Sequence, residues 1–380
     1  MGISSDLQRV IVARLKSAVP SVEGRVYDGP DEAAIMPHIT IGGSQVINDD
    51  AECIDAREEY LTIHIWASLM PETTHMLMWA MSDRTIPRSL RMIEGFGIHS
   101  FRLLNENGDS TFVKFHWRPK LGLQSTIWDE AVKLAGADPD FQRRDLFEAI
   151  QKGDFPEWEL GVQLFTEAEA EAFPFDHLDS TKVIPEELVP LQIVGRMVLD
   201  RWPDNFFAET EQVAYCPANV PPGIDFSNDP LLQGRLFSYP DAHRYRIGTH
   251  YESLPVNKPR SPVNHYNRDG SMPFGLRTNP DAYYEPNSFG GPVEDPSVEE
   301  PPHRYSGQVG RYEYRAEADH YSQPRALFQM FDDAHKERLF KTIAGAMQGV
   351  PQFIVDRQLG HFDKVHADYG AGIRRALASQ

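Results

Sequence analysis

Arg235 and Tyr239 are the residues whose types and spacing point most directly to chemistry. They lie in the stretch RLFSYPDAHRYRIG, residues 235–248, and residues four apart on a helix share one face. A tyrosine hydroxyl ordinarily ionises near pH ~10, so it is a poor anionic ligand at neutral pH. A guanidinium beside the phenolic oxygen favours the phenolate, which is a competent axial ligand for ferric haem. The spacing alone favours the simpler interpretation, a surface pair of Arg235 and Tyr239.

Such a helix needs a framework, and the segment 99–118 predicts a β-hairpin that can supply it. The runs HSFRLLN and STFVKFHWR flank an Asn107-Gly108 turn, a dipeptide suited to positive φ. Two further strands are expected in ELGVQLF, near residue 159, and in VPLQIVGRMVLDR, near residue 189. Helical patterns run through TIWDEAVKLAGA and DFQRRDLFEAIQKG, and the last 55 residues also predict helices.

The first 68 residues predict a small α+β unit, in which a helix at 4–19 lies on a short antiparallel sheet. Its strands are expected in GRVYD, HITIGG and EEYLTIHIWA. Far downstream, residues 255–302 contain ten prolines in 48 residues. Because each proline removes an amide donor, this segment predicts an extended arm that wraps over a partner surface.

The composition excludes several classes of protein. The 380 residues carry 37 Lys and Arg against 56 Asp and Glu, a formal net charge of −19, with a pI near 5.1. This balance disfavours binding to nucleic acid or to an anionic membrane, since polyphosphate surfaces select for clustered cations. Two distant cysteines, Cys53 and Cys216, make neither a disulfide framework nor a zinc site. With no long uncharged apolar stretch and no export signal, the sequence predicts a cytoplasmic protein.

From Leu69 onward the sequence resembles the haem catalases almost without interruption. The resemblance covers residues 69–380 and is most specific around Tyr239, where the motifs PPGIDFSNDPLLQGRLFSYPDAHRYRIG, DNFFAETEQVAY and YEPNSFGGP occur. Upstream it rests on VKFHWRP and DPDFQRRDLFEAIQKGDFPEWELGVQL. The resemblance implies haem as cofactor, hydrogen peroxide as substrate, and disproportionation to water and oxygen. It also implies a homo-oligomer, which is normally a tetramer in this family.

The resemblance also implies the roles of six residues. Tyr239 would be the proximal ligand of the haem iron, an arrangement already established for catalases, and Arg235 would keep it ionised. A hydrogen-bonded chain behind the ligand increases its donation to the metal. The residues expected to extend that chain or to meet a haem propionate are His99, Asp229, His243 and Arg246.

The distal side of the haem is where the sequence departs from this family. The resemblance implies a distal histidine and asparagine that precede the run SLMPE, residues 68–72. Nothing before residue 69 matches that region of the family. The two upstream histidines, His38 and His64, lie in strand patterns that favour a structural role, so no distal catalytic residue is assigned. Without a base for the peroxide proton, O–O cleavage loses a factor of roughly 10² to 10⁴, which places activity in doubt.

Some catalases bind NADPH at a short set of positions. His75, Ser82, Arg84 and His116 match that site. Four positions differ: Glu94 replaces an asparagine, Arg118 a lysine, Ile184 an aromatic residue and Glu186 a histidine. Glu94 and Glu186 would place carboxylates near the phosphates. The sequence therefore predicts no NADPH.

Residues 1–68 resemble a phage tail-completion or head-to-tail joining protein. The resemblance lies in DLQRVIVARLK, GRVYD, PHITIGG and ECIDAREEYLTIHIWA, and the join to the catalase-like text has no flexible linker. The alternative function is accordingly a phage-derived structural module that carries an inactive truncated catalase. A third reading is a half-barrel that binds haem or another apolar ligand without turnover.

Together these observations predict an α+β chain in four parts. A phage-like unit at 1–68 precedes a partial antiparallel catalase β-barrel with inserted helices at 69–200. The haem-ligand helix and the proline-rich wrapping arm follow at 201–325, and a C-terminal helical region at 326–380.

Overall fold

The computed structural model describes residues 26–27, 39–40, 67–261, 284–290 and 318–379. The chain divides into two compact units. One contains Met1–Ser82 and His320–Gln380, and the other contains Asp83–Asp319. His38 and His64, the predicted helix at 4–19 and most of the proline-rich segment lie outside the described residues.

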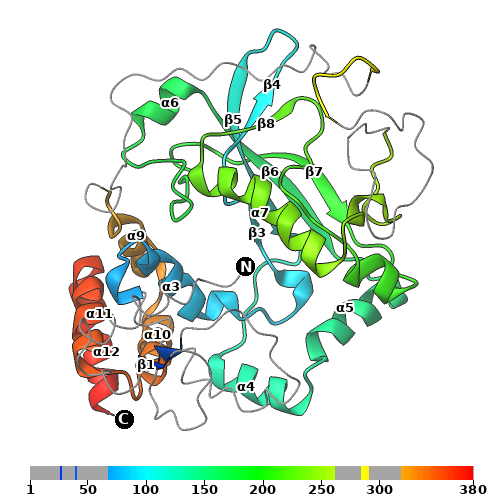
Figure 1. Cartoon of the computed structure of the whole chain (residues 1–380). Helices are drawn as coiled ribbons and strands as arrows, with labels where there is room; N and C mark the ends of the chain where they lie inside the picture. The colour runs from blue at the N-terminus through cyan, green and yellow to red at the C-terminus, as the bar shows by residue number, and fades with distance from the viewer. Residues whose placement is uncertain (1–25, 28–38, 41–66, 262–283, 291–317, 380) are drawn as a thin grey trace. The chain divides into compact units, whose positions relative to one another are not determined.

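The unit Asp83–Asp319 is built on an antiparallel sheet with the strand order β7-β6-β5-β4-β8 (Figure 1). A short additional strand, β3, pairs with β5. The strands are β3 (Gly95–Phe96), β4 (Phe101–Leu104), β5 (Ser110–Pro119), β6 (Glu157–Phe165), β7 (Gln192–Val198) and β8 (Ile224–Phe226). The long strands are those that the sequence predicts, whereas β3 and β8 are additions, because two or three residues are too short to show an alternating pattern.

The predicted hairpin is confirmed. Strands β4 and β5 pair with Phe101 opposite Val113 and Leu104 opposite Ser110. In the loop, the Asn105 side chain accepts hydrogen bonds from the amides of Asn107 and Asp109, and Gly108 has a φ of 78°. These contacts fix the register of the hairpin, and the register sets which side chains of β5 face each side of the sheet.

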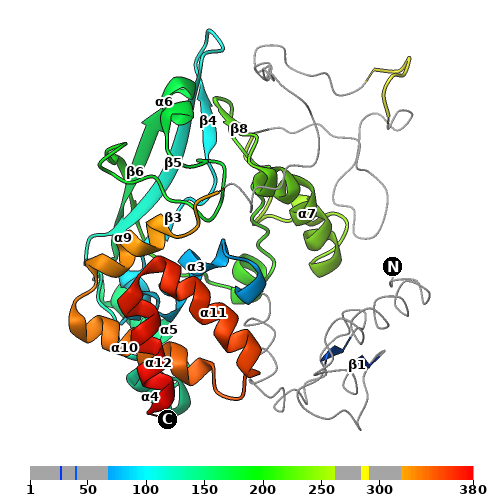
Figure 2. The ribbon, with the colours of Figure 1, turned by 90° about the vertical axis from the view of Figure 1, so that its left-hand side faces the viewer.

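Helices connect and flank these strands. They are α4 (Trp128–Ala137), α5 (Phe141–Lys152), α6 (Glu167–Ala172) and α7 (Pro230–Arg246), with short turns η3 (Asp83–Thr85), η4 (Leu90–Met92), η5 (Phe207–Glu211) and η6 (Tyr251–Ser253). The α7 helix follows β8 directly and lies beside the sheet in Figures 1 and 2. It is the element that carries Arg235 and Tyr239.

Residues 173–191, which connect α6 to β7 without regular secondary structure, cover one side of the sheet. Phe112 of β5 and Phe165 of β6 stack at 5.4 Å between ring centroids, and Ile184 and Val189 from the covering segment complete a buried cluster with Ala170. Gln163 of β6 is 1 % exposed, and its amide nitrogen donates to the carbonyls of Ile184 and Val189. This side of the sheet is therefore sealed by both apolar and polar contacts.

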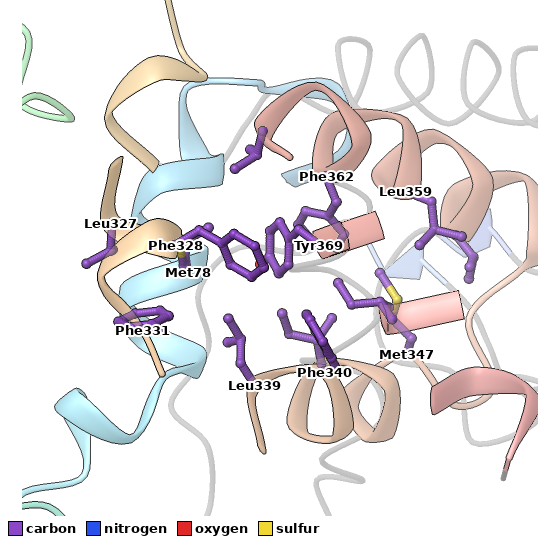
Figure 3. Close-up of a cluster of buried hydrophobic side chains, with 14 residues drawn as sticks. Met78, Leu327, Phe328, Phe331, Leu339, Phe340, Met347, Leu359, Phe362 and Tyr369 are labelled. Carbon is purple, nitrogen blue, oxygen red and sulfur yellow. The ribbon is translucent and has the colours of Figure 1, made fainter. Parts of the chain in front are cut away.

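The other unit is mainly helical. Its helices are α3 (Thr73–Met81), α9 (Ser322–Met330), α10 (Asp333–Ala346), α11 (Gln352–Val365) and α12 (Ala367–Ala378). Figure 3 shows their buried side chains meeting around Tyr369, whose ring lies 4.6 Å from Phe362 and 5.1 Å from Phe328. The predicted apolar stripes of the C-terminal helices, including Leu339 and Ile343, form this core.

One expectation for the opening segment is wrong. Strands β1 (Val26–Tyr27) and β2 (Ile39–Thr40) pair in parallel, with Val26 opposite Ile39, and not in an antiparallel sheet. A parallel pair needs a connection long enough to return along the sheet, and the chain between Tyr27 and Ile39 approaches that length. The alternating pattern that predicts the strands carries no signal for their relative direction.

Candidate functional site

The helix that carries Tyr239 begins at a capped end. The Asp229 carboxylate accepts hydrogen bonds from the amides of Leu231, at 2.8 Å, and Leu232, at 3.1 Å. Pro230 occupies the first helical position, where its missing amide donor costs nothing. The expectation of a helix through Arg235 and Tyr239 is thus confirmed, and the cap fixes where it starts.

Arg235 and Tyr239 are in contact, as their spacing predicts. One terminal nitrogen of Arg235 (Nη2) lies 2.6 Å from the Tyr239 hydroxyl, and the guanidinium carbon lies 4.5 Å from the centre of the ring. The other terminal nitrogen (Nη1) lies 2.7 Å from His99 Nε2. Arg235 therefore bridges the tyrosine of the helix to a histidine just before strand β4.

The bridge continues to Asp229, so four of the six expected residues form one chain. His99 Nδ1 lies 2.5 Å from Asp229 Oδ2, and the two residues are 4 % and 1 % exposed. Because guanidinium nitrogens only donate, His99 Nε2 accepts, and its proton sits on Nδ1 and is donated to Asp229. The four side chains, Tyr239, Arg235, His99 and Asp229, are called the proximal relay below.

Asp229 carries the negative charge of the relay. Burial raises the pKa of this carboxyl, but the hydrogen bonds from His99 and from the amides of Leu232 and Leu231 outweigh it and hold the pKa below its usual range. Asp229 is therefore ionised at neutral pH, and the end of the relay carries a full negative charge.

His243 and Arg246 have different surroundings. His243 is buried, donates from Nε2 to the Tyr215 carbonyl at 2.8 Å, and packs its ring 6.0 Å from that of Tyr239. Arg246 is exposed and donates to the carbonyls of Glu211 and Val213. Both residues connect the end of α7 to the end of η5 and the residues after it, and the His243 ring also packs against the Tyr239 ring.

These residues fit a haem group on two grounds. The Tyr239 hydroxyl oxygen, which accepts a hydrogen bond from the Arg235 guanidinium, is a hard oxygen donor of the kind that ferric haem iron takes. The aromatic rings of Phe101, Phe115 and Phe226 are half-buried and lie 6.3–6.4 Å apart, beginning two residues after His99. A flat apolar macrocycle needs such walls.

Sequence reasoning missed Lys114 and His177, which are buried in the same unit as the relay. Burial lowers the pKa of Lys114 to about 8 and that of His177 to about 4. The run STFVKFHWR places Lys114 in an alternating strand, and that pattern was the available signal for a cation on the covered side of the sheet.

No helix in the described part of the chain combines the length and the apolar character that a bilayer crossing requires.

Comparisons with known proteins identify a family that matches most of the chain. A family model described as Catalase matches residues 50–291, and one described as Catalase-related immune-responsive matches residues 315–377. The first match begins upstream of the boundary predicted at residue 68.

Individual proteins give the same result. Catalase C of Rhizobium meliloti is 48 % identical over 337 residues, which are 86 % of this chain and 47 % of the relative. Catalase HPII of Pseudomonas putida is 52 % identical over 285 residues, which are 73 % of this chain and 40 % of the relative. The chain therefore spans about half the length of these curated relatives.

Among solved structures, a bacterial catalase superposes with a TM-score of 0.76 at 33 % identity, covering 84 % of this chain and 66 % of that one. The expected α+β fold is confirmed by this likeness and by the antiparallel sheet. The chain belongs to the catalase family.

Proposed function

We propose that this chain binds haem through Tyr239 and that the protein disproportionates hydrogen peroxide to water and oxygen. The observation that carries the proposal is the 2.6 Å contact between Arg235 and the Tyr239 hydroxyl, continued by His99 to the buried Asp229. When bound, ferric haem would supply the redox centre that is oxidised by one peroxide and reduced by a second.

Each member of the relay has a defined task in this proposal. The Tyr239 oxygen would coordinate the iron, and Arg235 would keep that oxygen anionic by donating to it. His99 holds the second arm of Arg235, so the guanidinium cannot rotate away from the tyrosine. Asp229 fixes the proton of His99 on Nδ1 and caps the helix that carries the ligand. The residues that move the peroxide protons on the opposite side of the haem are not assigned in this chain.

The ligand assignment is tested with a matched pair of tyrosines on the same helix. Tyr239→Phe should abolish the Soret band of the haem-supplied protein, whereas Tyr245→Phe should leave it unchanged, because Tyr245 is 86 % exposed. A haem spectrum that is identical in Tyr239→Phe and in the wild type would contradict the assignment.

The alternative is a phage-derived structural module with an inactive catalase portion, and it rests on the sequence pattern of residues 1–68. Oxygen release from peroxide, measured together with the Soret band, separates the readings. Haem with oxygen release supports the enzyme, haem without oxygen release supports a binding protein, and neither supports the structural module.

We further propose that the chain does not use NADPH. Two arginines that could meet its phosphates are paired with carboxylates: Arg84 with Glu94 at 2.5 Å, and Arg118 with Glu186. A dinucleotide would have to displace these ion pairs and approach two carboxylates. Equilibrium dialysis with NADPH should therefore show no binding, and the double variant Glu94→Asn and Glu186→His is the form expected to gain it.

Assembly and location complete the proposal. The family resemblance supports a homo-oligomer, with a tetramer as the expected form, which light scattering of the purified protein tests. The acidic charge of −19 supports a cytoplasmic protein that binds neither nucleic acid nor membranes. Cell fractionation tests the location, and binding assays with DNA and anionic vesicles test the two exclusions.

A further inference from the structure

Tyr239 lies between two side chains of its own helix. Arg235 is four residues before it and His243 four residues after it, so all three share one face of α7. The Arg235 guanidinium carbon lies 4.5 Å from the centre of the Tyr239 ring, and the His243 ring lies 6.0 Å from it at an interplanar angle of 73°. The proximal relay restrains Arg235. The tyrosine ring is therefore held from both sides only if His243 is restrained as well.

The backbone of α7 does not by itself link these two sides firmly. Pro240 follows Tyr239 directly and has no amide hydrogen, so the helical hydrogen bond to the Leu236 carbonyl cannot form. Proline inside a helix is also a usual cause of bending. The half of the helix that carries His243 therefore needs contacts outside the helix to keep its position relative to Arg235.

The His243 ring has such contacts at both of its nitrogens. Nε2 donates to the Tyr215 carbonyl at 2.8 Å, and Nδ1 lies 3.4 Å from Nη2 of Arg246. The ring of the buried Tyr251 lies 5.4 Å from the His243 ring. The position of His243 thus depends on where the chain places the Tyr215 carbonyl and the Tyr251 ring.

The side chain of Asn257 bonds to the backbone next to both of these groups. Its Nδ2 donates to the carbonyls of Gln212, at 2.9 Å, and Tyr251, at 3.0 Å. Its Oδ1 accepts from the amide of Ala214 at 2.8 Å. The donors and the acceptor of this amide group are therefore all used, and they join residues 212–214 to the turn η6.

Arg246 holds the same stretch of chain from the end of α7. It donates to the carbonyls of Glu211 and Val213, which flank the Gln212 carbonyl that Asn257 holds. Asn257, Arg246 and the residues 211–215 between them are called the clamp below. The clamp fixes the stretch that presents its last carbonyl to His243.

We propose that Asn257 is a positioning residue for Tyr239, which acts through the clamp and His243. Without the Asn257 donors, the carbonyls of Gln212 and Tyr251 lose their partner, and the stretch that presents the Tyr215 carbonyl is free to move. His243 would then no longer hold its side of the Tyr239 ring. The consequence for haem rests on the proposed function, because a ring held from both sides presents its oxygen to the iron in one direction.

The direct test observes the Tyr239 ring in the absence of haem. In full-length protein labelled with ¹³C-tyrosine, Asn257→Asp should shift the NMR signal of this ring, because a carboxylate keeps the acceptor but has no N–H to donate. Tyr239→Phe identifies the signal. The matched control is Asn287→Asp, which should leave the signal unchanged. Asn287 also donates to a carbonyl, that of Tyr284, and accepts from an amide, that of Phe289, but these contacts stay within one exposed turn.

Hydrogen exchange of the same proteins localises the effect. In Asn257→Asp the amides of residues 211–216 and 243–247 should exchange about tenfold faster, because the clamp opens more often. The amides of residues 231–235, at the end of α7 that Asp229 caps, should keep their wild-type rates. If Asn257→Asp fails to fold, Asn257→Ala, which introduces no charge, should give the same two readings.

A double variant tests the route from the clamp to the ring. In a His243→Leu background, Asn257→Asp should not shift the Tyr239 signal further, since the group through which it acts is gone. A further shift of the same size would show that Asn257 reaches the ring by another route, and it would overturn the proposal.

The haem arm uses the same variants. Asn257→Asp should weaken haem binding about tenfold and shift the Soret band, whereas Asn287→Asp should do neither. A chain that binds no haem but shows the expected Tyr239 shift refutes the proposed function and leaves the role of Asn257 standing. A Tyr239 signal that is unchanged in folded Asn257→Asp, or equally changed in Asn287→Asp, overturns the role of Asn257.

Discussion

The helical core around Tyr369 and the proximal relay around Arg235 are both buried, but they are held together in different ways. The helical core joins fourteen apolar side chains whose contacts depend on shape and volume. The relay joins four polar side chains through hydrogen bonds of 2.5–2.7 Å. Many side chains could fill a core of the first kind, whereas the second fails when any one donor or acceptor is changed. The comparison therefore separates packing from chemistry within one chain.

The largest expected effect comes from removing a buried ring from the helical core. Phe328→Ala should lower the free energy of unfolding by about 3–5 kcal/mol, because it removes a ring that is 1 % exposed and packs against Tyr369 and Phe340. Chemical denaturation monitored by circular dichroism measures the change. The control is Met330→Ala on the same helix, which is 76 % exposed and should change stability by about 0.5 kcal/mol or less.

The next effect breaks the relay without changing its shape. Asp229→Asn keeps an oxygen to cap α7 but removes the charge, and it should cost about 3 kcal/mol at neutral pH. Since the pKa of Asp229 is lowered in the folded state, its contribution is present above its ordinary value near ~3.9 and is lost as the pH falls through the lowered value.

Denaturation of both proteins between pH 7 and pH 3 checks this expectation. The difference between the two stability curves should shrink toward the acid end. Asp241→Asn, an exposed position on the same helix, should run parallel to the wild type throughout. Two curves that stay equally far apart at all pH values would show that the Asp229 charge does not contribute.

A smaller effect is expected at Lys114, a buried charge that belongs neither to the helical core nor to the four side chains of the relay. Its pKa is lowered to about 8 in the folded protein, against ~10.4 in an unfolded chain. The unfolded state therefore binds more protons between these values, so stability should rise with pH across this range by about 2 kcal/mol. Lys114→Met should lack the rise. Lys120→Met removes an exposed lysine just after β5 and should retain it.

The smallest effect belongs to a surface ion pair of the helical unit. Arg374 and Asp363 lie 2.6 Å apart, but their side chains are 48 % and 42 % exposed. Asp363→Asn should therefore cost about 0–1 kcal/mol, and the cost should fall further in high salt. A loss that matched the loss in Asp229→Asn would remove the distinction between surface pairs and the buried relay.

Helices and strands were predictable where the residue pattern within a single segment is enough to identify them. The apolar stripes of α10 and α11 predict helices because a period of 3.6 residues is visible in the sequence, and the Asn107-Gly108 turn predicts the β4–β5 hairpin. Strand β8 has three residues, too few for a pattern, and it is a strand only because β4 offers it hydrogen-bonding partners. The direction of β1 relative to β2 was likewise invisible, since strand patterns do not encode it.

The site was predictable in two different senses. The contact between Arg235 and Tyr239 follows from their spacing on one helix, whereas His99 and Asp229 entered only through the family resemblance, because they lie 130 positions apart. Lys114 was not predicted at all. Lys114 alternates along β5 in the same way as the partly buried His116 and Arg118. The segment that covers Lys114 has no periodic pattern from which its burial could be predicted.

The separation of His99 from α7 along the chain also has a consequence for synthesis. During translation the hairpin is synthesised first. The partners of His99 are synthesised only after more than a hundred further residues have been added. Contacts between distant positions form slowly because closing the intervening loop costs entropy. The nascent chain therefore cannot form the relay until α7 has been synthesised, so the relay assembles after the hairpin.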